Sequence, residues 1–456
     1  MSRRNREKRA AKQKARGRAA GPGRGADTGP AGFRSADDRA VRRAAMLEGI
    51  RRAAVCTCAG IDGHAVELLA EFGAEARDLD AETDAAVTVM LGEMWRRGWQ
   101  PVDLVEITRR RTDATIAAFV AEAIVVESRR YAAATTHPRW RAQVEALGTV
   151  DVPAGESHVR AWRNRSDLER RAGLHAVLQA LSLLCRLPVF ERLLPLPGES
   201  RHLAGPAAGP EIGEVDQKAL AKVRALLAKA ESTQYPEEAE LLSAKAQELM
   251  SRYSLHQAVL EHDSGRAPLV SGRRMWLDAP YLDAKALLVQ EVATANRART
   301  IWSSGIGFAT IIGADSDLDA IELLTTSLLV QANRAMLAEG RHTTRTGTSR
   351  TKSFRQSFLL AYATRIGERL AAADSTATAE VGVEIGPAAA RDAAKPSEDR
   401  LLPVLAARAD ATDALLEELF PHVVKKGFSA SNSAGWAAGR AAADQAQMGV
   451  RGSIGG

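Results

Sequence analysis

Residues 222–255 constrain the fold most, because two segments with helical apolar periodicity flank a short polar turn. In the first segment, the apolar residues that share one helix face are Val223, Leu226, Leu227 and Ala230. Pro236 suits the first turn of a second helix, since its missing N–H has no intrahelical partner there. So short a turn predicts two adjacent antiparallel helices, which cannot bury both apolar stripes against each other alone. We therefore expect this hairpin to dock on the chain that follows residue 270.

The same segment carries a K-[IV]-R-x-L-L-x-K-A-E-S-T signature at residues 222–233, and E-A-E follows at residues 238–240. An A-x-x-L-M element then stands at residues 246–250. With these motifs the segment resembles a bacterial and phage family called domain of unknown function 2786. A looser similarity continues through residues 313–317 toward the C-terminus and implies an associated C-terminal domain. The family has no established activity, so the resemblance implies an architecture and no reaction.

Upstream of the hairpin, residues 36–190 predict an all-helical domain. Apolar residues recur at helical spacing most clearly over residues 80–97 and 166–187. Gly98 suits the end of the first of these helices, and Pro101 suits the start of the next.

Downstream of the hairpin, the apolar period changes from helical to alternating. Residues 299–303 and 307–312 predict a pair of antiparallel strands with a tight connection. Residues 266–274 are expected to form a loop, and residues 381–385 are expected to form a short strand. Asp315 or Ser316 is expected to begin a long helix. The chain is therefore expected to be mainly α, with an N-terminal all-helical domain followed by an α+β domain. That second domain would hold the central antiparallel helical hairpin and a small antiparallel β-sheet.

The expected organisation has five parts. They are a disordered basic arm at 1–35, the all-helical domain at 36–190, a Pro/Gly-rich linker at 191–213, the helical-hairpin domain of the unknown-function family at 214–262, and the associated α+β domain at 270–450.

Composition narrows the setting of the chain. Apolar residues make up 45% of it, which is enough for packed cores, and no apolar run reaches the roughly 18 residues that span a bilayer. Three cysteines and no signal peptide favour a reducing, cytoplasmic location rather than a disulfide framework. No membrane partner is expected. The formal net charge is +6, and much of the positive charge lies in two segments.

The basic arm and the segment at residues 341–352 are the candidate contacts with nucleic-acid phosphates. The first 24 residues hold ten Lys or Arg and one Glu, and residues 341–352 combine Arg with many Ser and Thr and no acid. The candidate nucleic-acid-binding residues are Arg3, Arg4, Arg6, Lys8, Arg9, Lys12, Lys14, Arg16, Arg18, Arg341, Arg345, Arg350 and Lys352. The alternatives are a solubilising tail or a misassigned start codon for the arm, and a solvated connector for the second segment.

Two other motifs favour structural roles. The helix–turn–helix at residues 80–111 carries Arg109 and its neighbours, but Asp103 and Glu106 on its second helix would repel phosphates. Gly435-x-x-x-Gly439 near the C-terminus favours close helix packing over an anion site.

No spacing of residues identifies an active site or a cofactor. Asp315, Asp317 and Asp319 open a helix, where acids normally complement the helix dipole. A magnesium site built on them would need a distant carboxylate such as Glu238. The sequence thus favours a non-enzymatic protein that binds DNA or RNA without sequence specificity, with no cofactor and no metal ligand. A metal-dependent hydrolase of nucleic acid or peptide, and a protein-interaction scaffold of mobile-element origin, are the alternatives.

Overall fold

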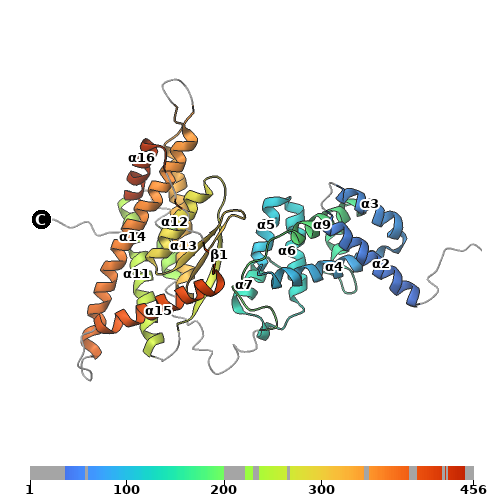
Figure 1. Cartoon of the computed structure of the whole chain (residues 1–456), viewed down its shortest axis with the longest axis horizontal. Coiled ribbons are helices and arrows are strands. Elements are labelled where there is room, and N and C mark those ends of the chain that lie inside the picture. The colour runs from blue at the N-terminus through green and yellow to red at the C-terminus, as the bar shows by residue number, and fades with distance from the viewer. Residues whose placement is uncertain are drawn as a thin grey trace, which may run out of the picture.

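The computed structural model describes residues 36–56, 60–199, 221–229, 236–263, 268–343, 349–389, 398–423, 427 and 430–446. These residues form two lobes placed along the long axis of the molecule (Figure 1). The chain is mainly α with one small antiparallel sheet, as the sequence predicts. None of the described helices is long and apolar enough to cross a membrane.

The described part of the N-terminal lobe is entirely helical. Its α-helices are α2 (Ala36–Val55), α3 (Ile61–Phe72), α4 (Ala76–Arg96), α5 (Pro101–Arg111), α6 (Ala114–Ser128), α7 (Pro138–Ala146), α8 (His158–Arg165) and α9 (Arg170–Cys185), with short 3-10 turns at Gly73–Glu75 and Ala133–Thr135. Gly98 follows α4 with a φ of +79°, and Pro101 is the first residue of α5, as predicted. The apolar faces meet in one buried cluster that includes Met46, Leu91 and Val177.

The second lobe combines long helices with three strands. After a helix at residues 221–229, its elements are α11 (Pro236–Asp263), β1 (Val270–Trp276), α12 (Leu282–Ala295), β2 (Arg299–Ser303), β3 (Phe308–Ala314), α13 (Asp315–Ala338), α14 (Thr351–Ala389), α15 (Glu398–Leu419) and α16 (Ser433–Asp444). The strand order is β1-β3-β2 and both pairings are antiparallel. The predicted pair of strands is thus confirmed as β2 and β3.

Helices cover both faces of the sheet. Ala309 and Ile311 of β3 lie in the same buried cluster as residues of α12, α13 and α14. Arg299 is opposite Ile312 in the sheet, on the face away from Ile311, and it pairs with Asp413 of α15 at 2.8 Å. The helix α15 therefore crosses the other face of the sheet (Figure 1).

The segment with the family signature docks on this lobe, as the sequence requires. Val223 and Leu227 of the 221–229 helix share a buried cluster with Ala246 and Met250 of α11. The same cluster contains apolar residues of α12, α13 and α14. The apolar stripes of the segment are thus buried by the chain that follows residue 270.

The Gly-x-x-x-Gly motif of α16 packs against α14. A Cβ atom at Gly435 would overlap the carbonyl oxygen of Phe354, and one at Gly439 would overlap that of Phe358. Asn432 caps the helix by accepting a hydrogen bond from Gly435 N at 2.9 Å. The two glycines therefore serve close backbone packing, in agreement with the preferred interpretation.

Two local expectations are wrong. Residues 266–274 do not form a loop throughout, because β1 begins at Val270. The strand expected at 381–385 is helical, because α14 runs unbroken to Ala389. Each residue added to an established helix gains a backbone hydrogen bond, which here outweighs the strand preference of Val381, Val383 and Ile385. Cys56 is disulfide-bonded and Cys185 is a free thiol.

Candidate nucleic-acid interface

A hairpin connects α13 to α14, and hydrogen bonds join its two ends, which we call its base. Residues 344–348 lie outside the described residues. Thr343 and Ser349 form an antiparallel bridge. The backbone oxygen of His342 accepts hydrogen bonds from Arg350 N at 2.8 Å and from Thr351 Oγ1 at 3.2 Å. The base of the hairpin is thereby fixed to the first turn of α14.

Five cations lie in or next to this base along the chain, and we call them the cationic tip. They are Arg334, Arg341, Arg350, Lys352 and Arg355. Arg355 is half-buried and the other four are exposed. Within the described residues, none of the five pairs with a carboxylate, and the one acid between residues 334 and 355 is Glu339. Their charges are therefore available to an external anion.

Arginines elsewhere in the molecule commonly have acidic partners. Arg109 and Arg110 of α5 both bind Glu106, at 2.7 and 2.6 Å. Arg365 and Arg440 both bind Glu368, at 2.7 and 3.0 Å. Other exposed arginines, such as Arg51 and Arg111, also lack acidic partners among the described residues. The cationic tip differs in that its five cations lie within residues 334–355, which contain a single acid.

The position of the cationic tip on α14 adds to its positive potential. The first turn of α14 contains no acidic residue, and it contains Lys352. The N-terminal end of a helix carries a partial positive charge that acids normally offset. Cations at this end add to that charge, so an anion bound here would be stabilised by both the side chains and the helix dipole.

The structure brings together three of the thirteen predicted binding residues, Arg341, Arg350 and Lys352. The others lie outside the described residues: Arg3, Arg4, Arg6, Lys8, Arg9, Lys12, Lys14, Arg16, Arg18 and Arg345. The role of all thirteen stays a prediction. Sequence reasoning missed Arg334 and Arg355, although neither has an acid three or four residues away on its helix, and that spacing is a signal for an unpaired cation.

The three aspartates that open α13 do not converge on a common point. Asp315 Oδ1 binds Arg139 Nη2 of α7 at 2.6 Å and accepts a hydrogen bond from Ser271 Oγ at 2.5 Å. Asp319 pairs with Arg273 of β1. Each carboxylate is thus neutralised by an arginine from a different element.

Asp317 connects the family segment to the rest of its lobe. Its Oδ2 accepts a hydrogen bond from Ser254 Oγ of α11 at 2.7 Å and lies 3.6 Å from Arg408 Nη1 of α15. Arg408 also donates to the carbonyl oxygen of Ser254 at 3.2 Å. Only 10% of the Asp317 side chain and 6% of the Arg408 side chain are exposed. This buried network joins three helices and leaves Asp317 little freedom to bind an ion.

These contacts count against the metal-dependent hydrolase. In the part of the chain that the structure describes, no three His, Cys, Asp or Glu side chains are grouped so that they could hold a metal ion. The side chain of Glu238, the fourth carboxylate considered, lies outside the described residues. The acids of α13 therefore serve the architecture of the lobe.

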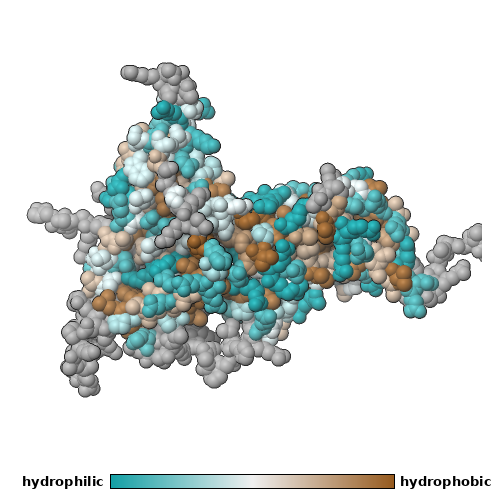
Figure 2. Space-filling view, viewed as in Figure 1, coloured by the Kyte–Doolittle hydropathy of each residue, from teal (hydrophilic) through white to brown (hydrophobic). Residues whose placement is uncertain are grey.

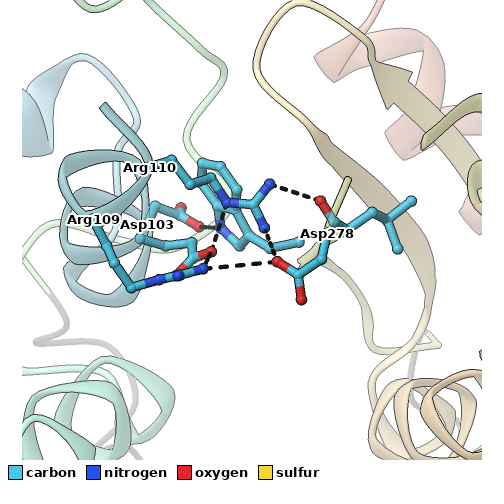
Figure 3. Close-up of polar contacts among 7 residues, drawn as sticks. Asp103, Arg109, Arg110 and Asp278 are labelled. Carbon is cyan, nitrogen blue, oxygen red and sulfur yellow. Dashed lines mark hydrogen bonds and ion pairs between the residues drawn. The ribbon is translucent and has the colours of Figure 1, made fainter. Parts of the chain in front are cut away.

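The helix–turn–helix of α4 and α5 faces the other lobe. Arg110 Nη1 donates to the carbonyl oxygen of Leu277 at 2.7 Å, and Nη2 binds Asp278 at 3.0 Å. Asp103 of the same helix accepts a hydrogen bond from Trp276 Nε1 at 2.8 Å. Figure 3 shows these side chains converging between α5 and the strand that leads to Asp278. This face of α5 is covered, so it is not free to enter a DNA groove.

A polar cleft lies between α4 and the start of α8. It is lined by Asp80, Asp84, Glu156 and Arg160, among others. Asp84 accepts hydrogen bonds from the backbone of His158 and Val159, and Arg160 pairs with Glu156. Burial raises the pKa of Asp80 and of Asp84. Asp80 pairs with Arg163, so all three of these acids already have partners within the protein and the cleft does not define a ligand.

Comparison with known proteins identifies only the central segment. Residues 218–257 match a family described as protein of unknown function (DUF2786), which confirms the resemblance carried by the signature. The match does not extend over the C-terminal region, so the associated domain stays a prediction. No curated protein and no solved structure matches the chain.

Proposed function

We propose that this protein binds DNA or RNA without sequence specificity and without catalysing a reaction, by contacting the phosphate backbone through the cationic tip and the basic N-terminal arm. The observation that supports this proposal is the absence of acidic partners, among the described residues, around five cations on one hairpin base. A cytoplasmic location, where nucleic acid is accessible, is part of the proposal.

The contacts would act mainly through electrostatics. Arg and Lys that neutralise phosphates release condensed counterions, and log affinity then falls against log salt with a slope of about −0.9 per contact on duplex DNA. Five contacts at the cationic tip would give a slope of about −4.5. Exposed hydroxyl groups such as those of Thr343 and Ser349 can add hydrogen bonds to phosphate oxygens.

The proposal includes sequence tolerance because the helix that the sequence singled out for possible base reading, α5, is covered. The α5 face that holds Asp103 and Arg110 is covered by the second lobe. Base-specific recognition requires side chains that reach base edges in a groove. The cationic tip instead combines Arg, Lys and hydroxyl groups, which bind phosphates of any sequence.

The test is a titration of labelled nucleic acid by fluorescence anisotropy at several salt concentrations between 50 and 200 mM, a range over which phosphate contacts are strongly screened. The test variant combines Arg341→Gln, Arg350→Gln and Lys352→Gln. A matched control combines Arg39→Gln, Arg96→Gln and Arg171→Gln, which removes the same charge from exposed arginines that have acidic partners.

We expect the test variant to reduce the magnitude of the salt slope by about 2.7, because three contacts are lost. The control variant should change the slope much less, because its arginines are already neutralised. Deletion of residues 1–24 should lower affinity further. The proposal is abandoned if the deletion and the triple variant together leave affinity for both DNA and RNA unchanged.

A further inference from the structure

The rings nearest the cationic tip are occupied by internal contacts. Phe354 and Phe358 lie beneath it with exposed fractions of 2% and 0%. The ring of His342 stacks on Phe354 with 3.5 Å between the ring centroids. Throughout the described residues, the large apolar side chains that are exposed are Val and Leu. The described surface of the tip therefore presents mainly charge and hydroxyl groups, and its partly exposed ring, that of His342, already has one face against Phe354.

The scarcity of exposed rings bears on whether the cationic tip binds a single strand or a duplex. Proteins that bind single strands combine a basic groove with aromatic side chains, and each stacked base contributes about 1–3 kcal/mol. A surface that lacks this contribution depends on phosphate contacts alone. Counterion release per contact is larger on a duplex, with slopes of about −0.9 against about −0.7 for a single strand.

The cations are also carried by ordered backbone. Arg334 lies on α13, and Lys352 and Arg355 lie on α14. Arg341 and Arg350 flank the hairpin base that the Thr343–Ser349 bridge holds. A duplex presents its phosphates at fixed spacing, whereas a single strand must first be ordered to match a fixed set of cations, and ordering costs conformational entropy.

We infer that the ligand of the cationic tip is a nucleic-acid duplex, contacted across its phosphates, rather than a single strand. This inference rests on the proposed function and specifies its substrate class. With five contacts, the slopes are about −4.5 for a duplex and about −3.5 for a single strand. If the two affinities are equal at 1 M salt, the duplex is bound about tenfold more tightly at 0.1 M salt.

The experiment uses the full chain with a labelled 20-base-pair DNA duplex, a duplex RNA of the same sequence and a 20-nucleotide polythymidine strand. Binding is measured at 0.1 M salt for the wild type, for the triple variant Arg341→Gln, Arg350→Gln and Lys352→Gln, and for the matched control Arg39→Gln, Arg96→Gln and Arg171→Gln. Circular dichroism establishes that each variant retains its helical content.

We expect the wild type to bind at least one duplex about tenfold more tightly than polythymidine. The triple variant should reduce the ratio of duplex to polythymidine affinity about fourfold, because three contacts are lost, and the control should leave the ratio unchanged. Equal or tighter binding of polythymidine would overturn the inference while leaving the proposed function intact. An affinity ratio that the triple variant leaves unchanged would also overturn it, because the preference would then arise elsewhere. If none of the three ligands binds, the proposed function itself fails.

Discussion

Arg274 of β1 and Asp103 of α5 form an ion pair between the two lobes, with 2.7 Å between Nη1 and Oδ2 and only 3% and 2% of their side chains exposed. Asp103 also accepts a hydrogen bond from Trp276. The Arg274 guanidinium lies 5.1 Å from the ring centroids of Phe190 and Phe308. Burying two charges is costly unless their hydrogen bonds are satisfied. Asp103 and both Nη atoms of Arg274 are hydrogen-bonded, while the buried Nε of Arg274 has no partner among the described residues. The pair therefore favours one relative arrangement of the lobes.

Replacing Arg274 alone should destabilise the protein strongly. Arg274→Met would leave the Asp103 carboxylate buried with Trp276 as its remaining donor in the described structure. Removal of one member of a buried ion pair costs about 3–5 kcal/mol. Urea unfolding followed by tryptophan fluorescence measures this loss, since Trp276 lies at the contact.

The double variant Arg274→Met with Asp103→Leu measures the coupling energy between the two residues. It should be less destabilised than the sum of its two single variants, because no unpaired charge is left in the interior. Arg96→Met, which breaks an exposed pair with Glu93, should change stability by less than about 1 kcal/mol. If the free-energy losses of Arg274→Met and Asp103→Leu add exactly in the double variant, Arg274 and Asp103 are not coupled.

The contact between Arg274 and Asp103 also shows which parts of the fold could not be predicted from the sequence. The strand pair, the long helix after Asp315 and the Gly98–Pro101 break were predictable, because each depends on local periodicity or on turn chemistry. The strand β1 was missed because it carries adjacent arginines, whose partners lie far away in the chain. Arg273 binds Glu322 at 2.5 Å and Arg274 binds Asp103.

The residues of the candidate site also divide into those that could be predicted from the sequence and those that could not. Arg341, Arg350 and Lys352 were predictable from a local run of basic residues without acids. The acids Asp103, Asp315 and Asp317 gave no such signal, since a carboxylate in a first helical turn looks the same whether it meets solvent, a metal ion or an arginine. Their partners come from other elements, and only the tertiary structure identifies them.

The glycine packing of α16 predicts opposite effects at two helical glycines. Gly439→Ala should destabilise the protein by about 1–3 kcal/mol, because the added methyl group overlaps the backbone of Phe358. Gly63→Ala in α3 meets nothing within 4 Å and should be neutral or stabilise by up to about 1 kcal/mol. Thermal unfolding of the two variants beside the wild type provides the comparison. A stabilised Gly439→Ala protein would contradict the close packing.

The contacts of the α13 aspartates predict insensitivity to divalent cations. Because Asp315, Asp317 and Asp319 each pair with arginine, neither magnesium nor EDTA should shift the unfolding temperature. A bound ion at 100 times its dissociation constant would add about 2.7 kcal/mol of stability. Differential scanning fluorimetry measures the shift, with Asp317→Asn as the comparison variant. A magnesium-dependent increase in the wild type that this variant abolishes would reinstate a metal site.

Glu368 predicts a small loss of stability in acid. Its carboxylate lies between Arg440 and Arg365, whose hydrogen bonds lower the pKa of Glu368 to about 2. The ionised form therefore favours the folded state above the ordinary glutamate pKa of about 4.5. That contribution is lost as the pH falls from about 4.5 toward about 2. Because 42% of the side chain is exposed, the contribution should stay below about 1 kcal/mol.

Glu368→Gln should accordingly unfold at a slightly lower temperature than the wild type at pH 7, and the difference should shrink between pH 5 and pH 3, the range in which the folded and unfolded carboxyl groups differ in protonation. Glu339→Gln serves as the control, since Glu339 is exposed and forms no ion pair with the described residues. It should match the wild type at both ends of the range. A difference at Glu368 that stays constant or widens in acid would mean that its carboxylate does not gain its stability from Arg365 and Arg440.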